Sequence, residues 1–245
     1  MGPSIQTIPL LNLAFAFVPV LLAIAILYKW SLDYAHALYG VARMLIQLLF
    51  VGYILTHIFE SDSSIIVILV LAIMVFASSW IALNTLPIKR STLYKYTLIS
   101  ILIGGGIPLI IVTQGVLALN PWYTPQFMIP LAGMIFANAM NSVSLSIERL
   151  NAEIKNGLSY IKARNTALHA SLIPITNSLF AVGLVSLPGM MTGQILSGAS
   201  PLIAVRYQIM VMCMIFASSV LSAAIFLLLV KPFFSKEHYK VVEDL

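Results

Sequence analysis

The sequence predicts an all-α, polytopic helical membrane protein with about seven transmembrane helices in a single domain covering residues 1–245. Of these residues, 60% are hydrophobic and only 9% are charged, whereas roughly 25% are charged in an ordinary soluble domain. The apolar residues form seven runs, each close to the about 20 residues that a helix needs to cross a bilayer. The sequence lacks the short alternating strands of an outer-membrane barrel, so we expect the spans to be helices.

The seven predicted spans occupy most of the chain and leave room for short connections only. They cover residues 8–27, 41–59, 65–83, 96–119, 127–147, 175–196 and 207–230. Of the 13 Lys and Arg residues, all except Arg206 fall on one side of this arrangement. The positive-inside rule therefore places the N-terminus outside and the C-terminus in the cytoplasm. This orientation explains the net charge of +5 without a nucleic-acid partner.

The longest predicted cytoplasmic piece covers residues 148–172, between the fifth and sixth spans. Leu158, Ile161, Leu168 and Leu172 recur at helical spacing, which predicts an amphipathic helix. Such a helix either lies among the lipid headgroups on the membrane surface or docks with a cytoplasmic partner. The residues that we expect to contact a partner are Glu148, Arg149, Lys155, Lys162 and Arg164.

Helix-breaking residues fall inside three predicted spans. The fourth contains glycines at 104–106 with Pro108, and the fifth contains Pro130 and Gly133. Interrupted helices are tolerated at membrane depth only where protein or a watery cavity receives the freed backbone groups, although small residues also serve close helix packing. The sixth span has the densest set, and we expect it to act as a hinge and gate. The predicted hinge residues are Gly183, Pro188, Gly189 and Gly193.

Polar and sulfur-containing side chains gather on the same late spans. Asn138, Asn141 and Ser142 share one helical stripe, which faces either a neighbouring helix or a pore. Met190 and Met191 lie beside the sixth-span break, where their thioethers could bind a soft metal ion or simply fill gaps in the core. The predicted substrate path consists of Asn138, Asn141, Met190, Met191 and Gln194, with Met190 and Met191 as candidate metal ligands.

Several function classes are disfavoured by missing motifs. The sequence has no GxxxxGK followed by Ser or Thr, no CxxC and no HExxH, and no nucleophile and base pattern is evident. No Asp or Glu lies well inside a predicted span, which argues against a carboxylate proton relay and an acidic cation filter. We therefore expect a non-enzymatic membrane protein with no cofactor of its own, powered by a partner or by a gradient.

Three stretches carry a resemblance to a known family. They read GLVSLPGMMTG at residues 183–193, ARMLIQLLFVGYIL at 42–55 and IPLAGMIFANAMNSVSLSIERL at 129–150. In these stretches the chain resembles the iron-export ABC permease family, which is related to bacterial and plant metal-resistance permeases. The resemblance implies a multi-pass permease subunit of the bacterial-type inner membrane that exports iron or a related metal. It also implies a permease homodimer and a separate cytoplasmic ATPase, which holds the ATP and Mg.

One departure from the family pattern keeps other functions open. The segment between the ERL motif and the next span is usually longer in the family, whereas residues 148–174 are shorter here and contain Asn156 and Gly157. In the main interpretation, ATP-driven closure of the partner pushes on this segment and swings the last three spans between inward and outward openings. The alternatives are an ATPase-independent channel or carrier, a homo-oligomer that has lost its ATPase, and a structural or regulatory subunit.

Overall fold

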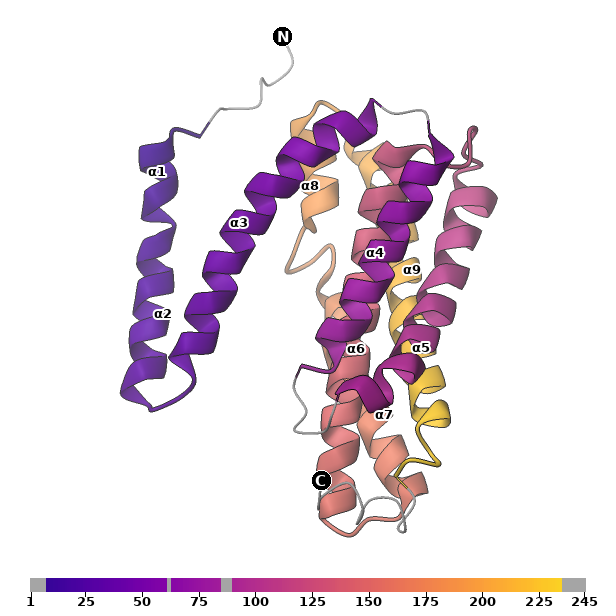
Figure 1. Cartoon of the computed structure of the whole chain (residues 1–245). Coiled ribbons are helices and arrows are strands. Elements are labelled where there is room, and N and C mark those ends of the chain that lie inside the picture. The colour runs from indigo at the N-terminus through magenta and orange to yellow at the C-terminus, as the bar shows by residue number, and fades with distance from the viewer. Residues whose placement is uncertain (1–7, 61–62, 85–89, 235–245) are drawn as a thin grey trace. The chain divides into compact units, whose positions relative to one another are not determined.

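The computed structural model describes residues 8–60, 63–84 and 90–234, and these residues are mostly helical (Figure 1). The chain divides into two compact units. Unit 1 comprises Met1–Ser61 and Leu196–Gly198, and unit 2 comprises Asp62–Ile195 and Ala199–Leu245. Six helical stretches in the described part of the chain are long and apolar enough to cross a membrane. The prediction of an all-α membrane protein is confirmed.

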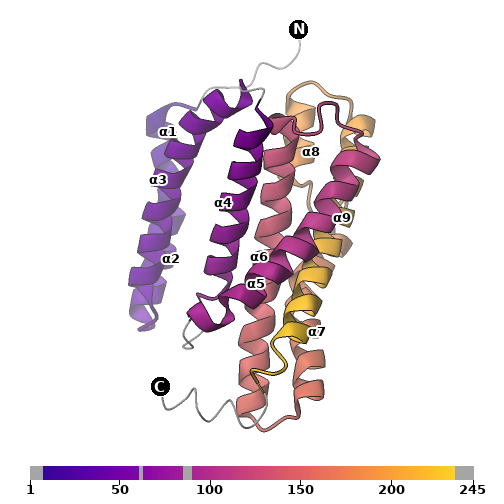
Figure 2. The ribbon, with the colours of Figure 1, turned by 45° about the vertical axis from the view of Figure 1, so that its right-hand side comes forward.

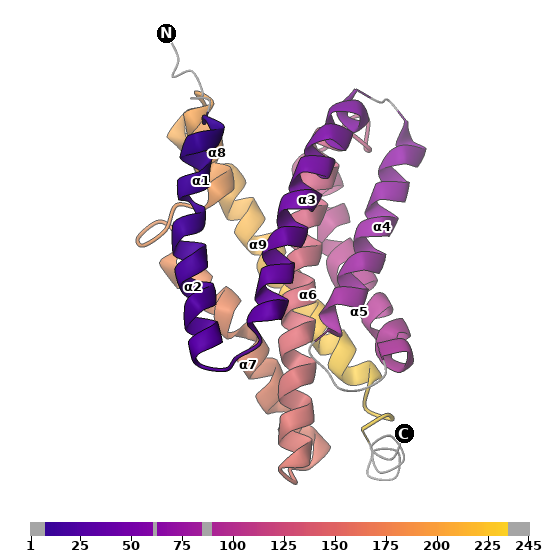
Figure 3. The same ribbon diagram turned by 60° about the vertical axis from the view of Figure 1, so that its left-hand side comes forward.

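Unit 1 contains a short helix, α1 (Leu10–Phe15), followed by the hairpin of α2 (Phe17–Lys29) and α3 (Tyr34–Phe59), which Figure 3 shows from the side. The Asp33 carboxylate caps α3 by accepting a hydrogen bond from the His36 amide at 2.9 Å. Neither α2 nor α3 buries a single residue. Their apolar side chains are therefore available to lipid or to another protein surface.

Unit 2 is a bundle organised around one long helix, α6 (Pro125–Lys155). This helix packs against α4 (Ser64–Ala82), α5 (Arg90–Ile110), α7 (Tyr160–Ala181) and α9 (Pro201–Leu229). Its core face carries Ile135, Val143, Ile147 and Leu150, none of which is exposed. Helix α5 continues as a π-helical turn, η1 (Ile111–Val116), and the short helix α8 (Gly189–Leu196) precedes α9.

Helices α5 and α6 continue through their glycines and prolines, so these two spans are not interrupted, and for α5 the alternative of close helix packing is the correct one. In α5, Gly104 serves close packing against α9, and Figure 2 shows the two helices crossing. A Cβ atom built on Gly104 would lie only 2.6 Å from the Cα atom of Ser222, so the α9 backbone occupies the space of the missing side chain. The neighbouring Gly105 faces the Phe136 ring of α6 in the same way.

The third interruption is present, so the predicted sixth span, residues 175–196, is not one helix. Helix α7 ends at Ala181, the chain turns through residues 182–188, and α8 begins at Gly189. Gly183 has a φ of +83°, a conformation that glycine adopts without steric cost. The turn satisfies its own backbone, since the amides of Leu184, Val185 and Ser186 all donate to the Ala181 carbonyl. Together α7 and α8 return the chain to the end of the bundle where α9 begins (Figure 1).

The prediction of a surface helix over residues 148–172 is also wrong. The segment instead forms the end of α6 and the start of α7, which pack against each other as a helical hairpin. The Gly157 amide donates to the Ile154 carbonyl and the Leu158 amide donates to the Glu153 carbonyl, and Gly157 has a φ of +85°. This is the Schellman arrangement that ends a helix, so Gly157 stops α6 where the sequence pattern suggested continuation.

A hydrogen bond from Tyr160 joins the hairpin to α9. The Tyr160 hydroxyl, at the start of α7, donates a hydrogen bond to the Leu227 carbonyl near the end of α9. The last four carbonyls of a helix have no partner within it, so Tyr160 supplies a donor that α9 lacks. Burial raises the pKa of Tyr160 to about 12, against a smaller opposing effect of the Arg164 charge. The phenol therefore keeps its proton at neutral pH.

The first prediction concerns the crossing of α5 and α9. Gly104→Ala should lower the free energy of unfolding by about 1–3 kcal/mol, because the new methyl group would overlap the α9 backbone. The matched control is Gly106→Ala, where a Cβ atom meets nothing within 4 Å and alanine is the better helix former. Thermal unfolding of the purified variants in detergent measures both effects. Equal changes of the unfolding temperature in the two variants would contradict the packing role of Gly104.

The second prediction concerns Tyr160. Tyr160→Phe should cost about 1 kcal/mol of stability at neutral pH, because the Leu227 carbonyl loses its donor. The folded-state pKa of about 12 lies above the ordinary value of 10.0, so this contribution is complete below pH 10 and lost as the pH rises toward 12. The free energy of unfolding of the wild type and of Tyr160→Phe, measured from neutral pH to pH 12, gives the contribution of the hydroxyl. The control is Tyr39→Phe, at an exposed tyrosine of α3. If the stability difference between the wild type and Tyr160→Phe grew above pH 10, the assignment would be contradicted.

Candidate functional site

A small polar cavity of about 80 Å³ lies between α6, α7 and α9 in unit 2 and opens to the surface, since Asn141 and Ser178 of its lining are exposed. We call it the Asn–Ser cavity. Its polar lining consists of Asn138, Asn141 and Ser142 from α6, Ser171 and Ser178 from α7, and Ser219 from α9. The remaining lining is apolar, and none of these residues carries a charge. At roughly 10–15 Å³ per occupied water position, the cavity has room for several waters or for a small ion with part of its hydration shell.

Helical spacing brings these side chains together. The stripe of Asn138, Asn141 and Ser142 was predicted from the sequence, and the structure places all three on the cavity side of α6. Ser171 and Ser178 are seven residues apart, which is about two turns of α7, so they share one face. Both Asn138 and Asn141 of the predicted substrate path therefore line the same cavity.

Three side chains around the cavity use N–H or O–H donors in hydrogen bonds to the backbone, and their oxygen atoms stay available as acceptors. The Asn138 amide nitrogen donates to the Met134 carbonyl at 2.8 Å. The Ser171 hydroxyl donates to the Leu168 carbonyl at 2.8 Å, and the Ser178 hydroxyl donates to the Pro174 carbonyl at 3.0 Å. Each of these side chains keeps at least one oxygen lone pair free. The cavity thus offers neutral oxygen acceptors, an environment that suits a cation or a hydrogen-bond donor.

Ser219 differs from the other serines of the cavity. Its side chain is only 1% exposed, and its hydroxyl oxygen has no hydrogen-bond partner within the described structure. Gln208 and Ser222, which are also buried on α9, have unpartnered oxygen atoms as well. The three residues lie within about 60° of one another around the helix. An unpaired buried polar group costs about 1–3 kcal/mol. Of the three residues only Ser219 lines the Asn–Ser cavity, so its hydroxyl is the candidate contact for a polar solute.

The other predicted path residues lie elsewhere. Met190, Met191 and Gln194 belong to α8, and none of them lines the Asn–Ser cavity. Met190 packs against the hydrophobic core, which is the gap-filling role. Adjacent residues on a helix do not face each other, so Met190 and Met191 direct their thioethers apart. Among residues 8–60, 63–84 and 90–234, no group of three or more His, Cys, Asp or Glu residues could hold a metal ion.

The predicted hinge residues surround the break between α7 and α8. Gly183 lies in the turn, Pro188 immediately precedes α8, and Gly189 and Gly193 belong to α8 itself. The Thr192 hydroxyl donates to the Pro188 carbonyl at 3.2 Å, which secures the start of α8. Leu184 and Val185 at the tip of the turn are 90% and 85% exposed. Movement at this turn stays a prediction.

The predicted partner-contact residues lie on the hairpin of α6 and α7. Glu148, Arg149, Lys155 and Lys162 are exposed, and Arg164 is half-buried with its guanidinium bonded to Asn165. Arg149 also pairs with Glu153 of the next helical turn at 2.5 Å. Glu153 itself is largely buried, and no sequence pattern distinguishes it from the exposed charges around it. The hairpin therefore exposes charges of both signs.

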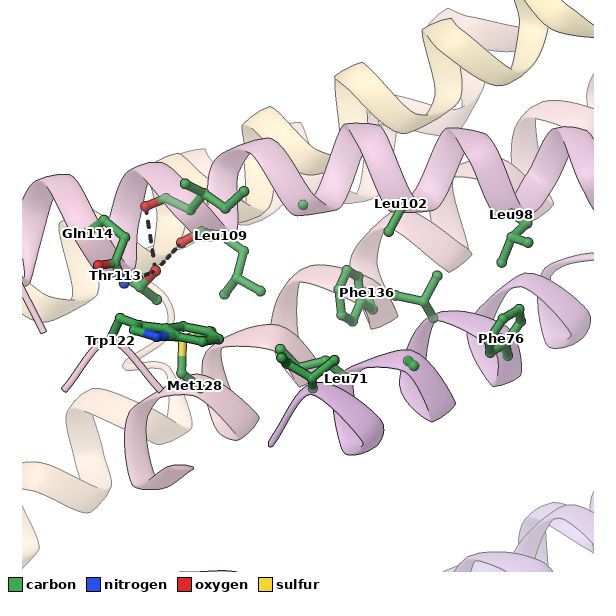
Figure 4. A pocket seen from close by; sticks show the side chains of 15 residues that line it. Leu71, Phe76, Leu98, Leu102, Leu109, Thr113, Gln114, Trp122, Met128 and Phe136 are labelled. Atoms are coloured by element: carbon green, nitrogen blue, oxygen red, sulfur yellow. Dashed lines mark hydrogen bonds between the residues drawn. The ribbon is translucent and has the colours of Figure 1, made fainter. Parts of the chain in front are cut away.

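A much larger apolar groove lies between α4, α5, η1 and α6, with a volume of about 700 Å³. Figure 4 shows Thr113, Gln114 and Trp122 together at one end, with Phe136 and Leu102 farther along. The Thr113 hydroxyl donates a hydrogen bond to the Leu109 carbonyl at 2.8 Å. Such a wall suits lipid chains or another apolar surface. The Asn–Ser cavity, in contrast, is polar and better suited to an ion.

Comparison with known proteins gives the family. The model of the uncharacterised protein family UPF0014 matches residues 10–234. The probable iron export permease protein FetB of Escherichia coli strain K12 is 34% identical over 96% of this chain and 95% of its own length. The UPF0014 membrane protein slr1647 of Synechocystis is 37% identical, over 82% of this chain and 83% of its own.

A plant relative agrees with these matches. Protein ALUMINUM SENSITIVE 3 of Arabidopsis thaliana is 33% identical over 93% of this chain and 88% of its own. No solved structure matches this chain. The apolar helices, the match along residues 10–234 and the full-length relatives together confirm the resemblance seen in the sequence. The chain therefore belongs to the uncharacterised protein family UPF0014, whose relatives include membrane proteins.

Proposed function

We propose that this chain is the permease subunit of an ABC-type exporter that moves iron or a related metal cation. The observation that carries the proposal is the Asn–Ser cavity, where amide and hydroxyl oxygens of three bundle helices meet without any charged side chain. The relatives lend support, because one is named a probable iron export permease and another is named for aluminium sensitivity.

The chemistry of the cavity favours a cation that prefers oxygen ligands. Carbonyl, hydroxyl and water oxygens suit harder cations, whereas thioethers suit softer ones. A neutral oxygen set also holds a cation loosely enough to release it, and transport requires such release. We therefore assign the substrate contact to Asn138, Asn141 and Ser219, and assign no metal contact to Met190 or Met191, of which Met190 packs against the core.

Energy would enter through the hairpin of α6 and α7. Both helices run without interruption from the hairpin to the cavity, since α6 includes Lys155 and Asn141, and α7 includes Lys162 and Ser171. A push by a cytoplasmic ATPase, which would hold ATP and Mg, would move the cavity walls as rigid rods. The turn at Gly183 would absorb the change. The assembly would be two permeases with two ATPases in a bacterial-type inner membrane.

The third prediction tests the cavity. Ser219→Ala should slow metal export by roughly three- to tenfold, because it removes one contact worth about 1 kcal/mol, while protein stability stays equal or rises. The matched control is Ser218→Ala on the same helix, whose buried hydroxyl already donates to the Ile215 carbonyl at 2.9 Å. Efflux of radioactive iron from cells and thermal unfolding give the two readouts. Equal transport by both variants would remove Ser219 from the path.

The fourth prediction tests the partner. A cytoplasmic ATPase should co-purify with the tagged chain from its native membrane, and metal should stimulate its ATP hydrolysis. Lys162→Glu reverses an exposed charge of the hairpin and should weaken this association several-fold, as is usual for a charge at the rim of an interface. Lys29→Glu, at the exposed last residue of α2, is the control. Metal flux through liposomes that contain this chain alone would instead establish an ATPase-independent channel or carrier.

A further inference from the structure

A second groove of about 520 Å³ runs between α9 on one side and α5 with η1 on the other. It is separate from the Asn–Ser cavity and shares no residue with it. On α9 its wall includes Arg206, Ile209, Cys213, Ala217 and Leu221, and the facing wall is aliphatic. The α9 residues recur every three or four positions, so they form one continuous stripe along the helix.

The length of this stripe matches one leaflet of a bilayer. From position 206 to position 221, α9 rises about 22 Å at 1.5 Å per residue. Half of a hydrocarbon core of about 30 Å is about 15 Å, and a lipid headgroup adds several ångströms. The groove is open along its length and lined almost wholly by apolar atoms, so one acyl chain can lie along it.

The charge of the groove lies at one end. Arg206 is the only charged residue of the lining, it is exposed, and it forms no ion pair or side-chain hydrogen bond with any residue that the structure describes. It stands near the start of α9, where a membrane boundary is expected. A guanidinium at this depth is well matched to a phosphate, which it can bind through two parallel hydrogen bonds.

We propose that this groove binds an anionic phospholipid, with its phosphate on Arg206 and one acyl chain along the α9 stripe as far as Leu221. A second copy of the chain fits less well, because a symmetric contact pairs the same patch with itself. The groove offers no acidic residue to meet Arg206 of the other copy. The headgroup of the lipid supplies that negative charge, and its chain covers the apolar wall.

The fifth prediction uses Cys213, the single cysteine of the chain, which is exposed and lines the groove. In nanodiscs of phosphatidylglycerol, N-ethylmaleimide should alkylate Cys213 about fivefold more slowly than in nanodiscs of phosphatidylcholine, as expected for one arginine that attracts an anionic lipid. Arg206→Gln should abolish this difference, and Arg206→Lys should retain most of it. Native mass spectrometry should show phosphatidylglycerol retained by the wild type and lost from Arg206→Gln.

The control for net charge is Lys231→Gln, an exposed cation just beyond the other end of α9, which should leave the lipid preference unchanged. Equal alkylation in the two lipids, or a preference that survives Arg206→Gln, would overturn the proposal. A disulfide-linked dimer through Cys213 under mild oxidation would also overturn it, by showing that a second copy occupies the groove. Folding of each variant is checked by its elution from a size-exclusion column.

Discussion

The close approach of α5 and α9 at Gly104 and Ser222 is the constraint on which unit 2 depends. Because Gly104 has no side chain, the α9 backbone fills its place, and α9 reaches α6 and α7 as well as α5. In lipid, van der Waals contact between small residues replaces much of the hydrophobic force that joins helices in water. This contact brings Ser219 of α9 to the same cavity as the asparagines of α6.

Most buried hydroxyl groups of the bundle serve their own helix. Ser79, Thr97 and Ser146, for example, donate to carbonyls three or four residues earlier, a common pattern that competes with interhelical bonding. Such hydrogen bonds do not join one helix to another. The buried oxygens of Ser219 and Ser222 on α9 are exceptions, because they have no partner within the described structure. This contrast identifies the α9 stripe more clearly than the abundance of serine does.

The sequence predicted the membrane class, most of the span positions and the stripe of Asn138 and Asn141, because hydropathy and helical periodicity are local properties. It left open whether α5 continues through Gly104, since a glycine that breaks a helix and one that admits a neighbouring helix look the same in the sequence. Ser171, Ser178 and Ser219 were likewise missed as one set, because they lie on two helices whose packing no local pattern reveals. The stop at Gly157 was readable as a C-cap signal, but the apolar repeat at Leu158–Leu172 was assigned to one helix over the whole of residues 148–172.

The π-helical turn η1 has a consequence for both grooves that flank it. Thr113 and Gln114 line the groove beside α4, while Ile111, Val112 and Val116 line the groove beside α9. The Leu117 amide donates to the Val112 carbonyl five residues earlier, so this turn holds one residue more than an α-helical turn. Removal of a single residue from it would restore the ordinary helical repeat and rotate the upstream and downstream side chains by about 100° relative to each other. The walls of two separate surfaces are thus set by one inserted amino acid.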